Sequence, residues 1–199
     1  MIRTTNGPAG RDFRLLGLMC LAFPTYQGLA IALVPLRMAH MGLSESTIGL
    51  VQALPGLMVL ALGAPFAQMA NTRWRGRTLV VVFCMAGAAS WLFGHAETAL
   101  GFIVPQLLVG ISTCAFYGNM LSVSFQLVGG PSPGAVQGRI SACQGLGYFA
   151  GPLLGGWLLS LGPATAFAPG LLCAGVGVWS AFRLAPSRDL EQRSGMASY

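Results

Sequence analysis

Six long apolar stretches, separated by short polar segments, constrain the fold of this 199-residue chain more than any other feature. A helix needs about 20 mostly apolar residues to cross the hydrocarbon core of a bilayer, because it rises about 1.5 Å per residue through about 30 Å. We expect spanning helices at residues 13–37, 47–70, 78–94, 98–122, 140–161 and 164–184. The sequence therefore predicts an all-α membrane protein with six transmembrane helices.

Composition excludes a soluble fold. The chain is 54% apolar and only 8% charged, whereas soluble domains carry about 25% charged residues. We expect three parts: a cytoplasmic N-terminus at 1–12, the six-helix membrane domain at 13–184, and a polar, disordered cytoplasmic tail at 185–199. The apolar run of the first helix is too long for a cleaved signal peptide.

The arginines predict the orientation. With six spans, ten of the eleven basic residues fall on one side of the membrane. These ten are Arg3, Arg11, Arg14, Arg73, Arg75, Arg77, Arg139, Arg183, Arg188 and Arg193. Arg37, at the outer end of the first helix, is the exception. Basic residues accumulate on the cytoplasmic side of inner-membrane proteins, so both termini are predicted to lie in the cytoplasm of a bacterium.

Metal, cofactor and enzyme chemistry find no support in the sequence. The five cysteines fall in different apolar stretches and lack CxxC spacing, which excludes the usual zinc and disulfide patterns. Neither an HExxH helix nor a GxSxG elbow occurs, so we expect no metal, no cofactor and no enzymatic activity. The net charge of +6 comes from arginines that the membrane topology explains, so no nucleic-acid partner is expected.

A glycine pattern marks the fifth predicted helix. Its positions are Gly138, Gly147, Gly151, Pro152, Gly155 and Gly156. Glycines four residues apart share one helix face and let another helix backbone approach closely. A proline inside the helix removes one backbone hydrogen bond and favours a bend. We predict a close helix-packing surface that takes part in conformational change; generic small-residue packing is the alternative.

The complete spacing, G-x8-G-x3-G-P-x2-G-G, resembles motif C of the major facilitator superfamily, the so-called antiporter motif. This resemblance implies the amino-terminal six helices of a twelve-helix secondary transporter, and it favours an exporter. It also implies that the glycine face meets the other half, so that Gly151→Leu would abolish assembly. Two halves of such a protein enclose the solute between them.

Two further segments resemble family motifs with departures. The loop after the second helix resembles motif A through Gly63, Asn71, Arg73, Arg75 and Arg77, with Asn71 in the acidic position. An amide makes weaker hydrogen bonds than a carboxylate, so any latch formed by this loop should be weak; simple topological anchoring is the other interpretation. Gln106 stands four residues before Gly110, where motif B has an arginine, which puts proton coupling in doubt.

Uncharged polar residues inside the predicted helices are candidates for the solute pathway. They are Tyr26, Gln27, Gln52, Gln106, Thr113, Tyr117, Gln144 and Tyr148. No Asp, Glu, Lys or His lies near the middle of a predicted helix, and intramembrane charges usually mark ion or charged-substrate sites. The sequence therefore favours a small neutral or apolar solute; hydrogen bonding between helices is the alternative for each residue.

The predicted function is secondary active transport of a small solute across a bacterial inner membrane. A second six-helix half is required, supplied by a second copy of the chain or by a separate carboxy-terminal half. A membrane scaffold or assembly factor without transport activity, and a truncated transporter fragment, are the alternatives.

Overall fold

The computed structural model describes residues 8–69, 75–127 and 133–184. Each predicted stretch is a helix. The helices are α1 (Pro8–His40), α2 (Glu45–Met69), α3 (Arg75–His95), α4 (Ile103–Leu127), α5 (Pro133–Leu159) and α6 (Pro163–Leu184), with the short 3-10 helix η1 (Leu100–Phe102) before α4. The all-α fold with six long helices is confirmed for the described residues.

Several helices begin earlier than predicted. Helix α1 begins at Pro8 instead of residue 13, and α5 begins at Pro133 instead of residue 140. Arg11, Arg14 and Arg139 therefore lie within helices. Helix α1, with 33 residues, is about 50 Å long at about 1.5 Å per residue. It is therefore longer than the hydrocarbon core of about 30 Å.

Five described helices are long and apolar enough to cross a membrane, namely all six except α5. Helix α5 has the length, at 27 residues. Its many glycines, together with Pro152, Gln144 and Tyr148, lower its mean hydropathy. Some of these residues, namely Gly147, Gly151 and Gly155, are also the ones that give this helix its close contacts, described below.

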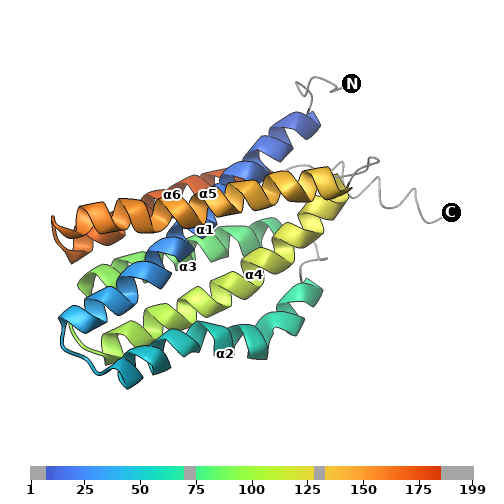
Figure 1. The fold of residues 1–199 in the computed structure, drawn as a ribbon. Coiled ribbons are helices and arrows are strands. Elements are labelled where there is room, and N and C mark those ends of the chain that lie inside the picture. Colours follow the sequence, from blue (N-terminus) through green and yellow to red (C-terminus); the bar gives the residue numbers. More distant parts are fainter. Residues whose placement is uncertain (1–7, 70–74, 128–132, 185–199) are drawn as a thin grey trace.

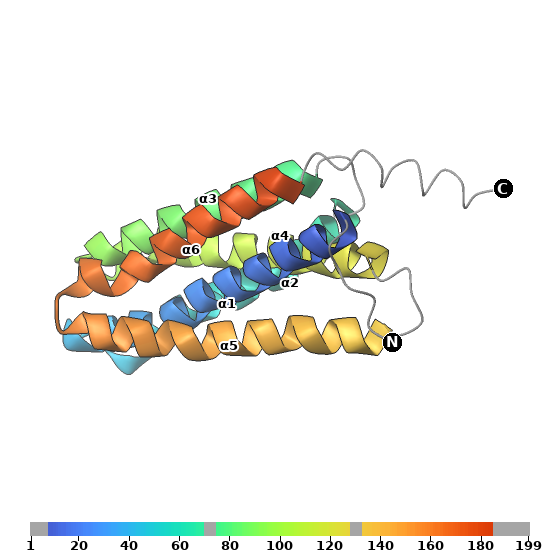
Figure 2. The same cartoon turned by 90° about the horizontal axis from the view of Figure 1, so that it is seen from above.

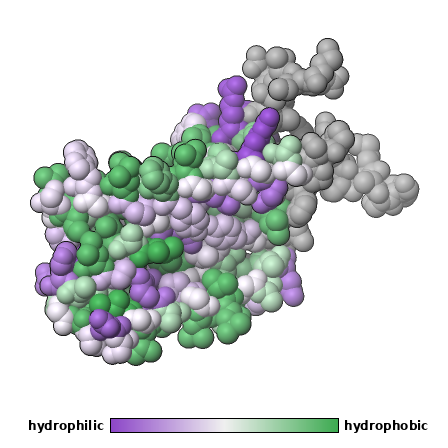
Figure 3. Space-filling model, in the orientation of Figure 1, coloured by the Kyte–Doolittle hydropathy of each residue, from purple (hydrophilic) through white to green (hydrophobic). Residues whose placement is uncertain are grey.

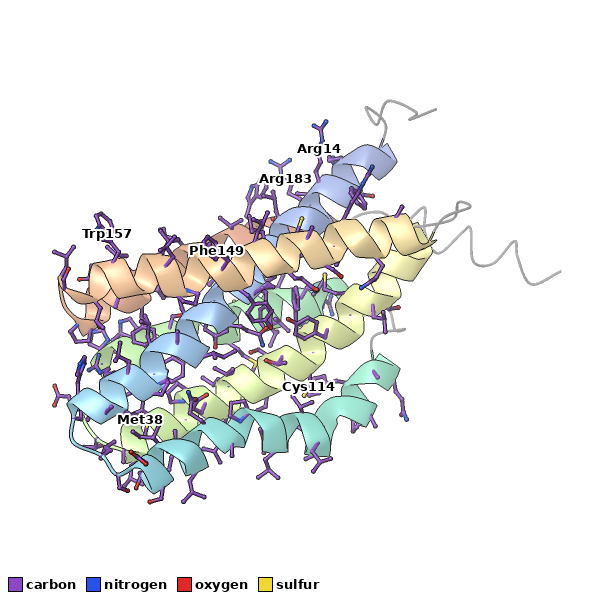
Figure 4. The ribbon with its side chains drawn as sticks, viewed as in Figure 1. Arg14, Met38, Cys114, Phe149, Trp157 and Arg183 are labelled. Carbon is purple, nitrogen blue, oxygen red and sulfur yellow. The ribbon has the colours of Figure 1, made fainter. Side chains whose placement is uncertain are left out.

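The helices form two layers. Figures 1 and 2 show α3 and α6 side by side behind a front face made of α5, α1, α4 and α2. The start of α1 and the end of α6 lie at the same end of the bundle, with Arg14 and Arg183 near this end in Figure 4. An even number of crossings gives this arrangement. Which end faces the cytoplasm stays a prediction from the arginines.

Aromatic side chains fill the core between α1, α3 and α4. Phe23 stacks on Phe116 with ring centroids 4.1 Å apart, and Phe83 meets both rings edge-on. Helix α1 is central: 72% of the residues in its most apolar segment are buried inside the bundle, compared with 6% for α2. Helix α2 packs mainly on α4, so most of its surface is left for lipid or for another polypeptide.

Arg37 has a structural use that the topology argument did not anticipate. Its guanidinium donates hydrogen bonds to the backbone oxygens of Gly94, at 2.9 Å, and Ala96, at 2.6 Å. These carbonyls lie at the C-terminal end of α3, where unpaired carbonyl groups and the helix dipole favour a cation. Arg37 thus ties the outer end of α1 to α3, which explains an arginine on the arginine-poor side.

Candidate solute-binding site

A seam of glycines joins α5 to α1. A Cβ atom added at Gly147 would lie 2.6 Å from the Leu21 carbonyl oxygen. One added at Gly151 would collide with the Thr25 carbonyl oxygen and lie 2.8 Å from the Leu29 nitrogen. One added at Gly155 would collide with the side chains of Leu29 and Leu33. Any side chain on this face of α5 would therefore push the two helices apart. We call this contact the α1–α5 seam.

Gly28 completes the seam from the α1 side. A Cβ atom there would lie 2.9 Å from Pro152 Cδ and 3.0 Å from the Tyr148 carbonyl oxygen. Pro152 has no N–H to pair with the carbonyl of the residue four positions before it, which is Tyr148. The carbonyl that Pro152 leaves without its helical donor thus lies against the bare backbone of Gly28.

The seam corrects one expectation. The glycine face was expected to meet a second half of the protein, but α1 of the same chain occupies it along Gly147, Gly151 and Gly155. The remaining two glycines of the pattern differ, since added Cβ atoms at Gly138 and Gly156 would meet nothing within 4 Å. Gly151→Leu is therefore expected to disrupt the fold of this chain before it affects any assembly.

Four of the predicted pathway residues form one hydrogen-bonded cluster next to the seam. Gln27 Nε2 of α1 donates to Thr113 Oγ1 of α4 at 2.7 Å. Gln27 Oε1 accepts from the hydroxyls of Tyr117 of α4 at 2.9 Å and Tyr148 of α5 at 2.6 Å. The two tyrosine oxygens are 2.8 Å apart. We call Gln27, Thr113, Tyr117 and Tyr148 the polar cluster.

Exposure within the polar cluster increases from α1 to α5. Gln27 is 5% exposed, Thr113 and Tyr117 are half-buried, and Tyr148 is 38% exposed. The cluster therefore opens onto the front face of the bundle. It offers uncharged donors and acceptors, which bind hydroxyl, amide or carbonyl groups without the desolvation cost of a charge.

A second polar contact lies on the same face between α4 and α2. Gln106 Nε2 donates to Gln52 Oε1, and Gln52 Nε2 reaches the Ile31 carbonyl oxygen at 3.4 Å. Gln106 and Thr113 are two helical turns apart on α4, so both point in one direction. This pair connects three helices, as the alternative of interhelical hydrogen bonding predicts.

The other two candidates do not join these contacts. Tyr26 is 1% exposed and packs against Phe23 in the core, and its hydroxyl has no hydrogen-bond partner among the described residues. Tyr26 therefore does not line the open face. Gln144 is half-buried one turn before Tyr148 on α5 and makes no hydrogen bond to the polar cluster.

The loop that resembles motif A is only partly described. Asn71 and Arg73 lie outside the described residues, whereas Arg75 and Arg77 are in the first turn of α3. A Cβ atom at Gly63 would meet nothing within 4 Å. The latch that the resemblance implies therefore stays a prediction.

Sequence reasoning missed Gly28 and two buried polar residues, Ser112 and Asn119. Asn119 is 1% exposed and donates to the Ala115 carbonyl oxygen at 2.7 Å. Gly28 carried a usable signal, since it directly follows the polar pair Tyr26-Gln27. Ser112 and Asn119 carried no such signal, because the sequence does not show in which direction a single small polar residue of an apolar helix points.

The front face combines a polar centre with apolar edges. Figure 3 shows pale and hydrophilic residues across its middle and hydrophobic residues along the edges formed by α5 and α2. On α5, the exposed apolar side chains Phe149, Leu153 and Trp157 recur every four residues, and Phe149 and Trp157 point away from the bundle (Figure 4). Exposed leucines, including Leu50 and Leu60, mark the α2 edge.

Comparison with known proteins agrees with the resemblance seen in motif C. Two proteins of Agrobacterium vitis named "Putative tartrate transporter" are 28% and 25% identical to this chain over 92% and 74% of its length. The matches cover 43% and 33% of those relatives, so the chain spans less than half of their length. The family model described as Major Facilitator Superfamily matches residues 15–198. Since this match covers more than half of the chain, the chain belongs to the major facilitator superfamily.

Proposed function

We propose that this chain forms one half of a secondary active transporter, and that the polar cluster is part of its solute-binding wall. The observation that supports this proposal is the meeting of α1, α4 and α5 at Gln27, Tyr117 and Tyr148 on the face that the bundle leaves open. Polar side chains within a bilayer are costly unless they are paired or line a wet cavity. A cavity between two halves would keep the exposed Tyr148 in water.

The polar cluster favours a neutral solute. Its members are uncharged, and the charged residues of the helices that carry it lie toward the helix ends, as Arg14 and Arg37 do on α1 and Arg139 does on α5. A buried charge without a partner costs several kcal/mol. This half of the pathway is therefore matched to a small solute that forms hydrogen bonds and has no net charge.

The names of the relatives support a second candidate, tartrate. Tartrate carries two hydroxyl groups, which fit the polar cluster, and two carboxylates, which the cluster does not neutralise. If the solute is tartrate, the positive charge has to come from a second half of the pathway.

We also propose that a second six-helix half, from another copy or from a separate chain, covers the front face in a bacterial inner membrane with both termini of this chain in the cytoplasm. The greater length of the relatives supports a second half, and the arginine distribution supports the orientation. The match to motif C favours export.

Transport assays with three related solutes test the proposal. Threitol, tartrate and succinate share a four-carbon chain; threitol has the hydroxyls without the carboxylates, and succinate has the carboxylates without the hydroxyls. We expect inverted membrane vesicles to take up radiolabelled threitol. They should also take up tartrate if a second half of the pathway supplies positive charge for its carboxylates. Gln27→Leu should abolish this uptake, because it removes the group that contacts three other members of the cluster.

Ser160→Ala is the control, since Ser160 follows the end of α5 and, among the described residues, its hydroxyl bonds only the Trp157 carbonyl oxygen. It should transport like the unmodified protein. Uptake that prefers succinate, uptake of none of the three solutes, or undiminished uptake by Gln27→Leu at equal membrane abundance would contradict the proposal.

A further inference from the structure

The polar cluster contains more oxygen contacts than protons. Gln27 Oε1 and the hydroxyl oxygens of Tyr117 and Tyr148 form a triangle with sides of 2.6, 2.8 and 2.9 Å. Each side is short enough for a hydrogen bond. The two hydroxyls bring one proton each and the amide oxygen brings none, so two sides can hold a proton and the third cannot.

Rotating the Gln27 amide by 180°, which exchanges its oxygen and nitrogen, does not remove the shortage of protons in the cluster. The two N–H groups would then face the tyrosines, and the amide oxygen would face Thr113. The Thr113 hydroxyl already lies 2.6 Å from the Val109 carbonyl oxygen, and its single proton cannot serve both acceptors. In either orientation of the amide, one close oxygen–oxygen contact in the cluster has no proton and is repulsive.

Tyr148 is the member of the polar cluster whose side chain can turn away from the other two oxygens. Gln27 is almost fully buried, and the Tyr117 ring packs edge-on against Phe23 and Phe116. Tyr148 is 38% exposed, and its ring makes no aromatic contact with the described residues. With the Gln27 amide oxygen facing the tyrosines, as it does in the structure, moving the Tyr148 hydroxyl out of the triangle breaks one hydrogen bond and also ends the contact without a proton. The net cost is therefore small.

We infer that the Tyr148 hydroxyl competes with a solute hydroxyl for Gln27 Oε1, so that the solute binds by displacing Tyr148 and donating its own proton to that oxygen. This inference rests on the proposed function. It specifies a solute that carries at least one hydrogen-bond donor. It also makes Tyr148 a competitor of the solute, since only the fraction of molecules with Tyr148 turned away can bind.

Two phenylalanine substitutions distinguish this role from direct binding. Tyr148→Phe removes the competing hydroxyl and should lower the KM for threitol by about two- to threefold, the low end for one neutral hydrogen bond, because the contact without a proton offsets part of that bond. Tyr117→Phe removes a hydroxyl that stays beside the bound solute and should raise the KM by a similar factor. Equal membrane abundance and equal melting temperature of both variants exclude a folding effect.

A higher KM in Tyr148→Phe would overturn the inference, because it would make the Tyr148 hydroxyl a direct solute contact. A second test uses the tetramethyl ether of threitol, which keeps the four oxygen acceptors and has no O–H donor. Its competition against labelled threitol should be weak, and competition equal to that of threitol would contradict the requirement for a donor at Gln27. Failure of the proposed function is distinguishable, since threitol transport would then be absent or unaffected by Gln27→Leu.

Discussion

Two helix pairs of this bundle use glycine in different ways. The α1–α5 seam has close approaches at four levels, from Gly147, Gly151 and Gly155 on α5 and Gly28 on α1. The pair formed by α2 and α4 has one, at Gly110, where an added Cβ atom would lie 2.9 Å from the Pro55 carbonyl oxygen. The first pair approaches closely along most of its length, while the second has a single close glycine approach.

The difference indicates which part of the front face is preorganised. The α1–α5 seam fixes the backbones of Gln27 and Tyr148 relative to each other, because Gly28 directly follows Gln27 and lies against the Tyr148 backbone. Helix α2, which is mostly unburied, can shift relative to α4 at a smaller cost. A solute site therefore belongs on the α1–α5 side, and adjustment of the open face belongs on the α2 side.

The largest expected effect is that of Gly151→Ala. The new methyl group would collide with α1 backbone that has no room to move, and overpacking of this kind costs about 1–3 kcal/mol. Unfolding by SDS of the purified protein should show this loss. Gly156→Ala lies on the same helix in open space and should leave stability unchanged or raise it by up to about 1 kcal/mol. Equal effects of the two variants would mean that the seam does not exist.

A smaller effect is expected on the α2–α4 side. Gly110→Ala should cost about 1 kcal/mol, near the low end for overpacking, because the peripheral α2 can move outward. Its control is Gly118→Ala, where the nearest atom, the Phe66 carbonyl oxygen, would be 3.5 Å away. The same SDS unfolding assay compares them. A loss at Gly110 larger than at Gly151 would reverse the proposed order of the two pairs.

The smallest effect concerns the hydrogen bond between Gln106 and Gln52. Hydrogen bonds between membrane helices average about 0.6 kcal/mol in double-mutant cycles. Gln106→Leu, Gln52→Leu and the double variant should give a coupling energy of this size. A coupling above about 2 kcal/mol would show that α2 is fixed more firmly than its single glycine contact indicates.

The sequence predicted the helices well and their partners poorly. Long apolar runs specify spanning helices because the bilayer sets their length, and the spacing of Gly147, Gly151 and Gly155 revealed a packing face. It did not reveal the helix that packs there, because a bare glycine face fits any close backbone. The same holds for the polar residues. Gln27 and the residue before it, Tyr26, were both predicted as pathway candidates, but Tyr26 faces the core. Adjacent helical positions differ by about 100° in direction, and only the packing decides which one faces the open side.

Labelling of introduced cysteines tests the central claim, that the polar cluster faces a water-filled pathway. Tyr148→Cys and Phe149→Cys place a thiol at neighbouring exposed positions of α5, in a background where the five native cysteines are replaced. In intact membranes, a charged methanethiosulfonate reagent should modify Tyr148→Cys and leave Phe149→Cys unmodified, because thiolates form in water and not in lipid. Equal labelling of the two, or labelling of Phe149→Cys alone, would contradict the account.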